Sequence, residues 1–302
     1  MMYDIIIVGA GPSGLTAAIY GRRAMKSVLV LEGKAYGGQI VNTPSIENYP
    51  VVPHISGYDF ATNLFNQAKE LGTEIKYQKV LNIIDYGDKK EVITKEEKYY
   101  SKAVIISVGS RSKELGLANE EKFVGRGVSY CATCDGNFFK KRDVAVIGGG
   151  NTALEDALYL SDIANIVYLI HRRDSFRGDE NTLSKLKEKS NVIFIYNSTV
   201  TKLNGNDRLE SIEITNKDGN NKTIEVTGIF IAIGRVPENE IFSNIIDIDE
   251  FGYAKADEDC KTKTPGVFVA GDNRTKEVRQ LVTATSDGAI SATAAIKYIN
   301  EL

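Results

Sequence analysis

The chain has 302 residues, of which 42% are apolar and 25% charged, and its formal net charge is −3 at pH 7. This length allows two domains with complete cores, so the fold needs neither a metal nor a disulfide for stability. The charge balance offers no broad basic surface for nucleic acid. The sequence shows no basic leader and no apolar run long enough to cross a membrane, so we expect a cytoplasmic protein that binds neither nucleic acid nor membranes.

A dinucleotide-binding pattern opens the chain. A β-branched strand at 4–8 leads into the Gly-x-Gly-x-x-Gly turn 9–14, and a helix over 15–23 and a second strand over 27–31 follow. The first glycine permits the tight turn, the middle one lets backbone approach a pyrophosphate, and the third lets the helix pack on the strand. Glu32 then follows the second strand. A carboxylate there binds an unphosphorylated ribose, which suits FAD or NAD.

Two of the three cysteines, Cys131 and Cys134, lie close together ahead of a second glycine-rich segment. In a reducing compartment a C-x-x-C pair is more often catalytic or metal-binding than structural. Zinc would need four ligands, but Cys260, His54 and His171 are scattered and lack ligand spacing, so no metal site is predicted.

The opening pattern then recurs. Residues 143–153 match residues 4–14 position for position, and a second helix over 154–161 and strand over 165–170 follow. One such turn is weak evidence for a nucleotide site, whereas two copies in strand-turn-helix context are strong evidence. The two copies therefore predict two dinucleotide sites.

The residues after the second strand distinguish the two sites. His171 stands where the first copy has Glu32, and it opens a basic segment that includes Arg172, Arg173 and Arg177. Guanidinium groups suit a 2′-phosphate, so this segment indicates NADPH. The alternative is a solvated basic loop. With a flavin in the first site, the motifs together describe a redox relay from NADPH through FAD to the cysteine pair.

Short strands fill the rest of the second segment. We expect strands at 192–195, 209–215 and 222–226, separated by turn residues and forming an inserted meander. A third nucleotide-side strand at 267–272 leads to an alanine-rich helix through 288–299, with no glycine fingerprint after it. This C-terminal piece is expected to return and complete the first domain.

The predicted fold class is therefore α/β, with two Rossmann-like dinucleotide-binding domains, the second inserted in the first. Residues 1–112 plus 246–302 form the FAD domain, and residues 113–245 form the NADPH domain with the C-x-x-C centre. The crossovers near 111–116 and 240–248 supply the paired connections that a hinge needs.

Over essentially its whole length the chain resembles a low-molecular-weight bacterial-type thioredoxin reductase, and residues 131–136, Cys-Ala-Thr-Cys-Asp-Gly, match that family's active-site hexapeptide. The resemblance implies a homodimer with one FAD per subunit that reduces thioredoxin with NADPH. The residues predicted to bind FAD are Gly9, Gly11, Pro12, Ser13, Gly14, Glu32, Gly33, Gly38, Gln39, Asn48, Gly271, Asp272, Arg279, Gln280 and Leu281. The residues predicted to bind NADPH are Gly148, Gly150, Asn151, Thr152, Ala153, His171, Arg172, Arg173, Arg177 and Gly234.

The resemblance also assigns roles in the redox centre. It makes Cys134 the cysteine next to the flavin and Cys131 the one that forms the mixed disulfide with thioredoxin. Asp135 is a candidate general acid if a partly closed site raises its pKa. Alternatively, Asp135 simply opens the turn with Gly136.

Three other functions compete with this interpretation. A peroxide-reductase flavoprotein subunit needs an added thioredoxin-like domain, for which we expect no room because the chain starts at its first strand. A ferredoxin-type flavin reductase would lack the dithiol. A flavoprotein redox sensor would keep both nucleotide sites but has no need of a solvent-reachable dithiol.

Overall fold

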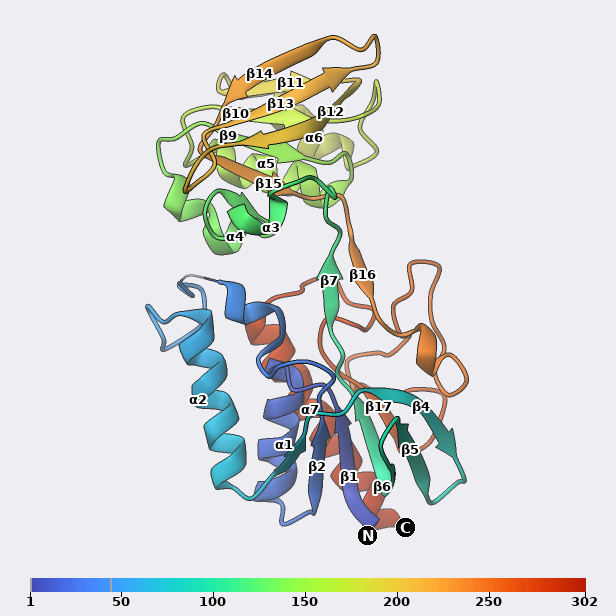
Figure 1. Ribbon diagram of the computed structural model, residues 1–302. Helices are drawn as coiled ribbons and strands as arrows, with labels where there is room; N and C mark the ends of the chain where they lie inside the picture. Colours follow the sequence, from blue (N-terminus) through green and yellow to red (C-terminus); the bar gives the residue numbers. More distant parts are fainter. Residues whose placement is uncertain (1, 44) are drawn as a thin grey trace. The chain divides into compact units, whose positions relative to one another are not determined.

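The computed structural model describes residues 2–43 and 45–302. The chain divides into two compact units (Figure 1): unit 1 is Met1–Arg111 with Val236–Leu302, and unit 2 is Ser112–Arg235. Among the described residues, no helix is long and apolar enough to cross a membrane.

Unit 1 is built on a seven-stranded sheet with the order β3-β2-β1-β6-β5-β4, in which β17 also pairs with β6. The long strand β6 pairs with β5 through residues 98–101 and with β17 through residues 104–106. The C-terminal segment therefore completes the sheet that the N-terminal segment begins. The strands are β1 (Met2–Val8), β2 (Val28–Leu31), β3 (Glu74–Lys76), β4 (Val80–Asp85), β5 (Lys90–Thr94), β6 (Lys98–Ile106) and β17 (Val267–Val269).

Alternation along β1 places a core on each face of this sheet. Ile5 and Ile7 pack with the helices α1 and α7, which lie together on one side of the sheet in Figure 1. Ile6 and Val8 pack on the other face with Phe242 and its neighbours. The helices of unit 1 are α1 (Pro12–Arg23), α2 (Gly57–Glu70) and α7 (Leu281–Glu301), with the 3-10 turns η1 (Gly38–Asn42) and η3 (Glu240–Phe242).

Unit 2 repeats this plan around a five-stranded parallel sheet with the order β11-β10-β9-β15-β8. Val144 and Val146 of β9 pack with α5, and Ala145 and Ile147 pack with the antiparallel sheet β12-β13-β14. The strands are β8 (Val128–Ser129), β9 (Val144–Ile147), β10 (Val167–Ile170), β11 (Val192–Ile195), β12 (Ser198–Asn204), β13 (Ser211–Asn216), β14 (Asn221–Glu225) and β15 (Gly228–Ile231). The helices are α3 (Glu120–Phe123), α4 (Ala132–Asp135), η2 (Gly136–Phe139), α5 (Asn151–Ser161) and α6 (Glu180–Glu188).

The units are joined by two short strands that pair with each other, β7 (Ser110–Ser112) and β16 (Arg235–Pro237). The second crossover thus precedes the segment 240–248 in which the sequence placed it. The reason is packing: Phe242, Ile245 and Ile246 are buried in the core of unit 1 and belong to that unit.

The parallel sheets confirm the predicted α/β class, and the meander needs one correction. Strand β11 was expected in the meander, but it pairs in parallel with β10 at the edge of the main sheet. The first meander strand is instead β12, whose alternating buried and exposed residues include one lysine and two threonines. Its weak apolar pattern explains why the sequence did not reveal it.

Candidate active site

Both glycine-rich turns are closed by backbone contacts. A Cβ atom on Gly9 would lie 2.5 Å from the carbonyl oxygen of Ser107, and one on Gly14 would lie 2.0 Å from that of Gly9. In unit 2, a Cβ on Gly148 would lie 2.4 Å from the carbonyl oxygen of Ala232. The first and third positions of these turns are therefore fixed by the packing of strand against helix.

The middle glycines behave differently. A Cβ on Gly11 or Gly150 would meet no described atom within 4 Å. These two glycines are the N-caps of α1 and α5, and neither helix start has a side-chain capping bond. Each turn therefore combines open space with a helix N-terminus that no described side chain caps, the arrangement that binds a phosphate group.

Two further segments meet the start of α1. A Cβ on Gly38, which begins η1, would lie 3.5 Å from the Cα of Gly11, and one on Gly271, after β17, would lie 3.0 Å from the Cβ of Ser13. The Ser13 hydroxyl is buried and has no hydrogen-bond partner in the described part of the chain. A buried hydroxyl in this state fits a site whose bound group supplies the partner.

Glu32 directly follows β2, beside the same turn. Its Oε2 accepts a hydrogen bond from the backbone N–H of Ala10 at 2.8 Å, and its Oε1 accepts one from Lys34 at 2.8 Å. The carboxylate is held at the position where a ribose hydroxyl would be bound in such a domain.

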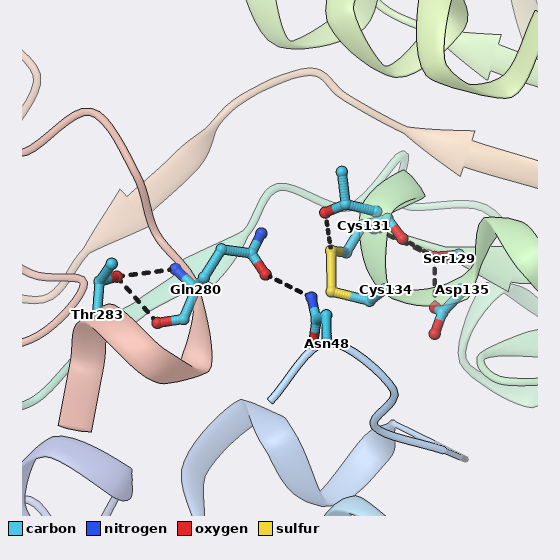
Figure 2. Close-up of a disulfide and its surroundings, with 8 residues drawn as sticks. Asn48, Ser129, Cys131, Cys134, Asp135, Gln280 and Thr283 are labelled. Carbon is cyan, nitrogen blue, oxygen red and sulfur yellow. Dashed lines mark hydrogen bonds between the residues drawn. A yellow bond between two sulfur atoms is a disulfide. The ribbon is translucent and has the colours of Figure 1, made fainter. Parts of the chain in front are cut away.

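Figure 2 shows the side-chain amides of Asn48 and of Gln280, the N-cap of α7, which pair with each other. Asn48 Nδ2 donates to Gln280 Oε1 at 3.1 Å, and Gln280 forms a capping box with Thr283. Arg279 lies over the Tyr253 ring at 4.0 Å, and its Nε is buried without a hydrogen-bond partner among the described residues. The other residues predicted to bind FAD lie in or beside these segments: Pro12 in α1, Gly33 after β2, Gln39 in η1, Asp272 after β17 and Leu281 at the start of α7.

In unit 2, His171 follows β10 and covers the second turn. A Cβ on Gly149 would lie 2.2 Å from its Cε1, and its ring stacks on Phe176 at 5.3 Å. Only 6% of the residue is exposed. Burial and the nearby Arg177 and Arg173 lower its pKa, so the imidazole is neutral at pH 7. His171 therefore packs against the glycine-rich turn and does not present a cation to a ligand.

The three predicted arginines remain at the surface. Arg172, Arg173 and Arg177 are exposed and make no ion pair with an acidic side chain in the described part of the chain. The backbone N–H of Arg177 donates to the carbonyl of Gly149 at 2.7 Å, which ties the basic segment to the glycine-rich turn. A set of uncompensated cations beside a phosphate-type turn suits a ligand with an additional phosphate.

Three of the remaining residues predicted to bind NADPH lie in the first turn of α5, and Gly234 follows β15. Asn151 Oδ1 accepts from the backbone N–H of Asp179 at 2.9 Å. Thr152 is exposed in the first turn of α5, and Ala153 is buried. The backbone N–H of Lys113 donates to the carbonyl of Gly234 at 2.9 Å, just beyond β15.

Cys131 and Cys134 form a disulfide, with Cα atoms 5.3 Å apart (Figure 2). Cys131 is the N-cap of α4, and the intervening Ala132 is buried against the core that includes α5. Both cysteines are partly exposed. In the described part of the chain, no group of three or more His, Cys, Asp or Glu side chains could hold a metal ion.

Asp135 lies in the same turn and has two inequivalent oxygens. Its Oδ2 accepts from the Ser129 hydroxyl at 2.6 Å, while its Oδ1 is buried without a partner among the described residues. Burial raises the pKa of this carboxyl, and the hydrogen bond from Ser129 partly opposes that rise. The group is thus suited to hold a proton beside the disulfide.

Two buried carboxylates organise the site and carry no recognisable signal in the sequence. Glu120 accepts hydrogen bonds from the backbone N–H groups of Leu115, Gly116 and Leu117. It also accepts one from the hydroxyl of Tyr130, the residue before Cys131. Its position in an acidic run gave no sign of this role.

Asp287 is the second. Its Oδ2 accepts from the Gly271 N–H at 2.9 Å and from Arg274 Nε at 2.8 Å, and Lys276 also donates to it. The buried cluster fixes the backbone of Gly271 beside α1. Only the fold reveals it, because a helix-interior aspartate usually faces solvent.

These features define a disulfide oxidoreductase with two nucleotide-binding folds, and the chain belongs to the family described as pyridine nucleotide-disulphide oxidoreductase, which it matches over residues 3–288. It is therefore an oxidoreductase.

The individual relatives narrow this class. The chain is 41% identical to thioredoxin reductase from Listeria innocua, over 100% of this chain and 95% of the relative. It is 39% identical to the solved thioredoxin reductase from Streptococcus pyogenes, with a TM-score of 0.95 over 100% of this chain and 99% of the other. It is also 39% identical to the Lactococcus lactis thioredoxin reductase in its FR conformation, with a TM-score of 0.70 over 99% and 100%. The resemblance found in the sequence is confirmed.

Proposed function

We propose that the chain reduces the disulfide of thioredoxin with electrons from NADPH, which pass through FAD and the Cys131–Cys134 pair. The observation that carries the proposal is the partly exposed disulfide in the unit that also holds the open glycine turn and the uncompensated arginines. Full-length relatives named thioredoxin reductase support it.

The two nucleotides are assigned by the chemistry of the two turns. The FAD pyrophosphate is assigned to Gly11 and Ser13 of unit 1, with Glu32 on the ribose. The NADPH pyrophosphate is assigned to Gly150 of unit 2, with Arg172 and Arg173 on the 2′-phosphate. When bound, the flavin accepts a hydride from NADPH and supplies two electrons to the disulfide.

The cysteines then carry the exchange. Once reduced, the Cys131 thiolate attacks a sulfur of the thioredoxin disulfide, and one thioredoxin cysteine leaves as a thiolate. Cys134 attacks the mixed disulfide at Cys131, which restores the Cys131–Cys134 bond and releases the second thioredoxin thiolate. Two protons complete the thioredoxin dithiol, and Asp135 is the group placed to supply one of them.

This sequence of steps requires rotation between the units. The proposed nicotinamide site and the dithiol belong to the same unit. Hydride transfer needs reacting atoms at roughly 3 to 3.5 Å, so the nicotinamide and the dithiol cannot both contact the flavin at the same time. In the part of the chain that the structure describes, the two units are connected through the paired strands β7 and β16, and these strands serve as the hinge. A relative solved in a named FR conformation is consistent with more than one state in the family. A homodimer and a cytoplasmic location follow from the family resemblance and complete the proposal.

Stopped-flow absorbance tests the relay. NADPH should bleach the flavin of the purified yellow protein, and oxidised thioredoxin should restore its absorbance. Bleaching without reoxidation by thioredoxin would indicate a different acceptor, and a protein without flavin would refute the relay altogether. A reversible crosslink between the units should stop turnover until a reductant opens it, whereas native turnover in the crosslinked protein would exclude the rotation.

A further inference from the structure

The Ser129 hydroxyl occupies the centre of the redox turn. It donates to Asp135 Oδ2 at 2.6 Å and accepts from the backbone N–H of Cys131 at 3.1 Å. Ser129 ends β8, pairs with Phe230 of β15 and is 4% exposed. One buried side chain therefore links the main sheet of unit 2 to both the first cysteine and the candidate acid (Figure 2).

The hydrogen bond makes the two oxygens of Asp135 different. Oδ2 is occupied by Ser129, whereas Oδ1 is buried without a partner in the described part of the chain. The helix packed against α4 is α5, whose titratable groups near this contact are Glu155, Asp156 and Tyr159. Among the described residues, the pKa of Asp135 responds to burial first and to Ser129 second, and no charged side chain contributes.

We infer that Ser129 is a positioning residue that holds the Asp135 carboxyl by Oδ2, so that Oδ1 carries the proton used in thiol release. The inference deepens the proposed function and rests on it. In the step that releases thioredoxin, Cys134 attacks the sulfur of Cys131 in the mixed disulfide, and the bond from Cys131 to thioredoxin breaks. Its electron pair goes to the thioredoxin sulfur. The proton on Asp135 passes to that thiolate, directly or through water, and Asp135 regains a proton from solvent.

A purely structural role for Ser129 would predict different behaviour. If the hydroxyl only anchored the N–H of Cys131, its loss would slow the reaction equally at every pH and independently of Asp135. If it acts through Asp135, its loss removes a hydrogen bond that stabilises the carboxylate, so the pKa of Asp135 rises further. The rate with thioredoxin falls as pH rises through that pKa, so the fall should move to higher pH.

The test compares Ser129→Ala with the isosteric pair Ser129→Thr and Ser129→Val, of which only threonine keeps the hydroxyl. We expect Ala and Val to move the basic limb of kcat/KM for thioredoxin upward by about one pH unit and to lower its plateau roughly tenfold. Threonine should keep the native limb. Tyr130→Phe is the matched control: it removes the hydrogen bond from the Tyr130 hydroxyl to Glu120, next to Cys131, and should not move the basic limb.

A double-mutant cycle and infrared spectroscopy give readouts that do not depend on turnover alone. In an Asp135→Asn background, Ser129→Val should cost no further activity. The infrared band of the protonated Asp135 carboxyl is assigned by its loss in Asp135→Asn, and Asp156→Asn separates it from the band of Asp156. The midpoint of its titration should lie about one pH unit higher in the Val variant than in the Thr variant. An equal midpoint in both, or a full additional loss in the double variant, would overturn the inference. If thioredoxin is not the substrate, turnover fails in every variant, while the infrared midpoints still decide the role of Ser129.

Discussion

The assignment of the 2′-phosphate can be tested by removing Arg172 and Arg173 together. Both side chains are exposed and form no ion pair with described acidic residues, so Arg172→Ala with Arg173→Ala leaves no carboxylate unpaired. We therefore expect the variant to fold normally, with its thermal midpoint close to that of the native protein.

The expected magnitude follows from hydrogen bonds to a charged phosphate. Each such bond contributes about 1.5 to 3 kcal/mol, and neighbouring cations are not additive, so losing both should cost about 3 kcal/mol. This corresponds to a fall of roughly 100-fold in kcat/KM for NADPH. NADH has no 2′-phosphate, so its kcat/KM should change little, and the preference for NADPH should nearly disappear.

The assay measures flavin reduction and steady-state kcat/KM with each coenzyme. Lys202→Ala with Lys222→Ala is the charge-matched control, because both lysines are exposed on the antiparallel sheet of unit 2. The control should keep the native preference. If the arginine variant also keeps the native ratio of NADPH to NADH, the basic segment is an ordinary solvated loop and the coenzyme assignment is wrong.

Three other predictions concern different parts of the site. Cys131→Ser should give a long-wavelength charge-transfer band from the Cys134 thiolate beside oxidised flavin, and Cys134→Ser should trap thioredoxin on Cys131; either variant reducing thioredoxin at the native rate would refute the relay. Gly11→Ala should lose FAD while unit 1 stays folded, because its Cβ meets open space, whereas Gly14→Ala should fail to fold, because its Cβ would lie 2.0 Å from a carbonyl oxygen; circular dichroism and flavin content separate these outcomes. Burial raises the pKa of Asp156 from 3.8 to about 7, so the folded state binds the proton more tightly than the unfolded state does. The free energy of unfolding should therefore fall as pH rises from 3.8 to about 7 and stay level above that. Asp156→Asn should abolish this slope and add on the order of 4 kcal/mol at pH 8, and an unchanged slope in urea titrations would show that Asp156 is not responsible.

The nucleotide-binding folds could be predicted because their signals are local. Strand, glycine turn and helix follow one another in the chain, so spacing alone locates the turns at 9–14 and 148–153. The position of strand β17 could also be predicted, because the apolar run 267–270 leads directly to a glycine. These predictions depend on short-range backbone geometry, which the sequence encodes directly.

The interactions that were missed depend on residues brought together by the fold. Ser129 reaches Asp135 only after a helical turn forms, and Asp287 reaches Gly271 across unrelated elements. The boundary at β16 was misplaced for a similar reason, since the burial of Phe242 and Ile245 is decided by tertiary packing. No periodic pattern marks such contacts.

The second residue of each glycine turn shows how one fold accommodates two different residues after its second strand. In unit 1 this residue is Ala10, and its N–H donates to the Glu32 carboxylate. In unit 2 it is Gly149, and the ring of His171 lies so close that a Cβ would be 2.2 Å from it. The turn residue and the residue after the second strand therefore form a matched pair. A carboxylate at that position needs only an N–H from the turn, whereas a flat ring needs the space that glycine leaves. Because His171 is buried and neutral, the positive charge of the second site comes from the exposed arginines that follow it, so the scaffold of that site and its charge reside in different residues.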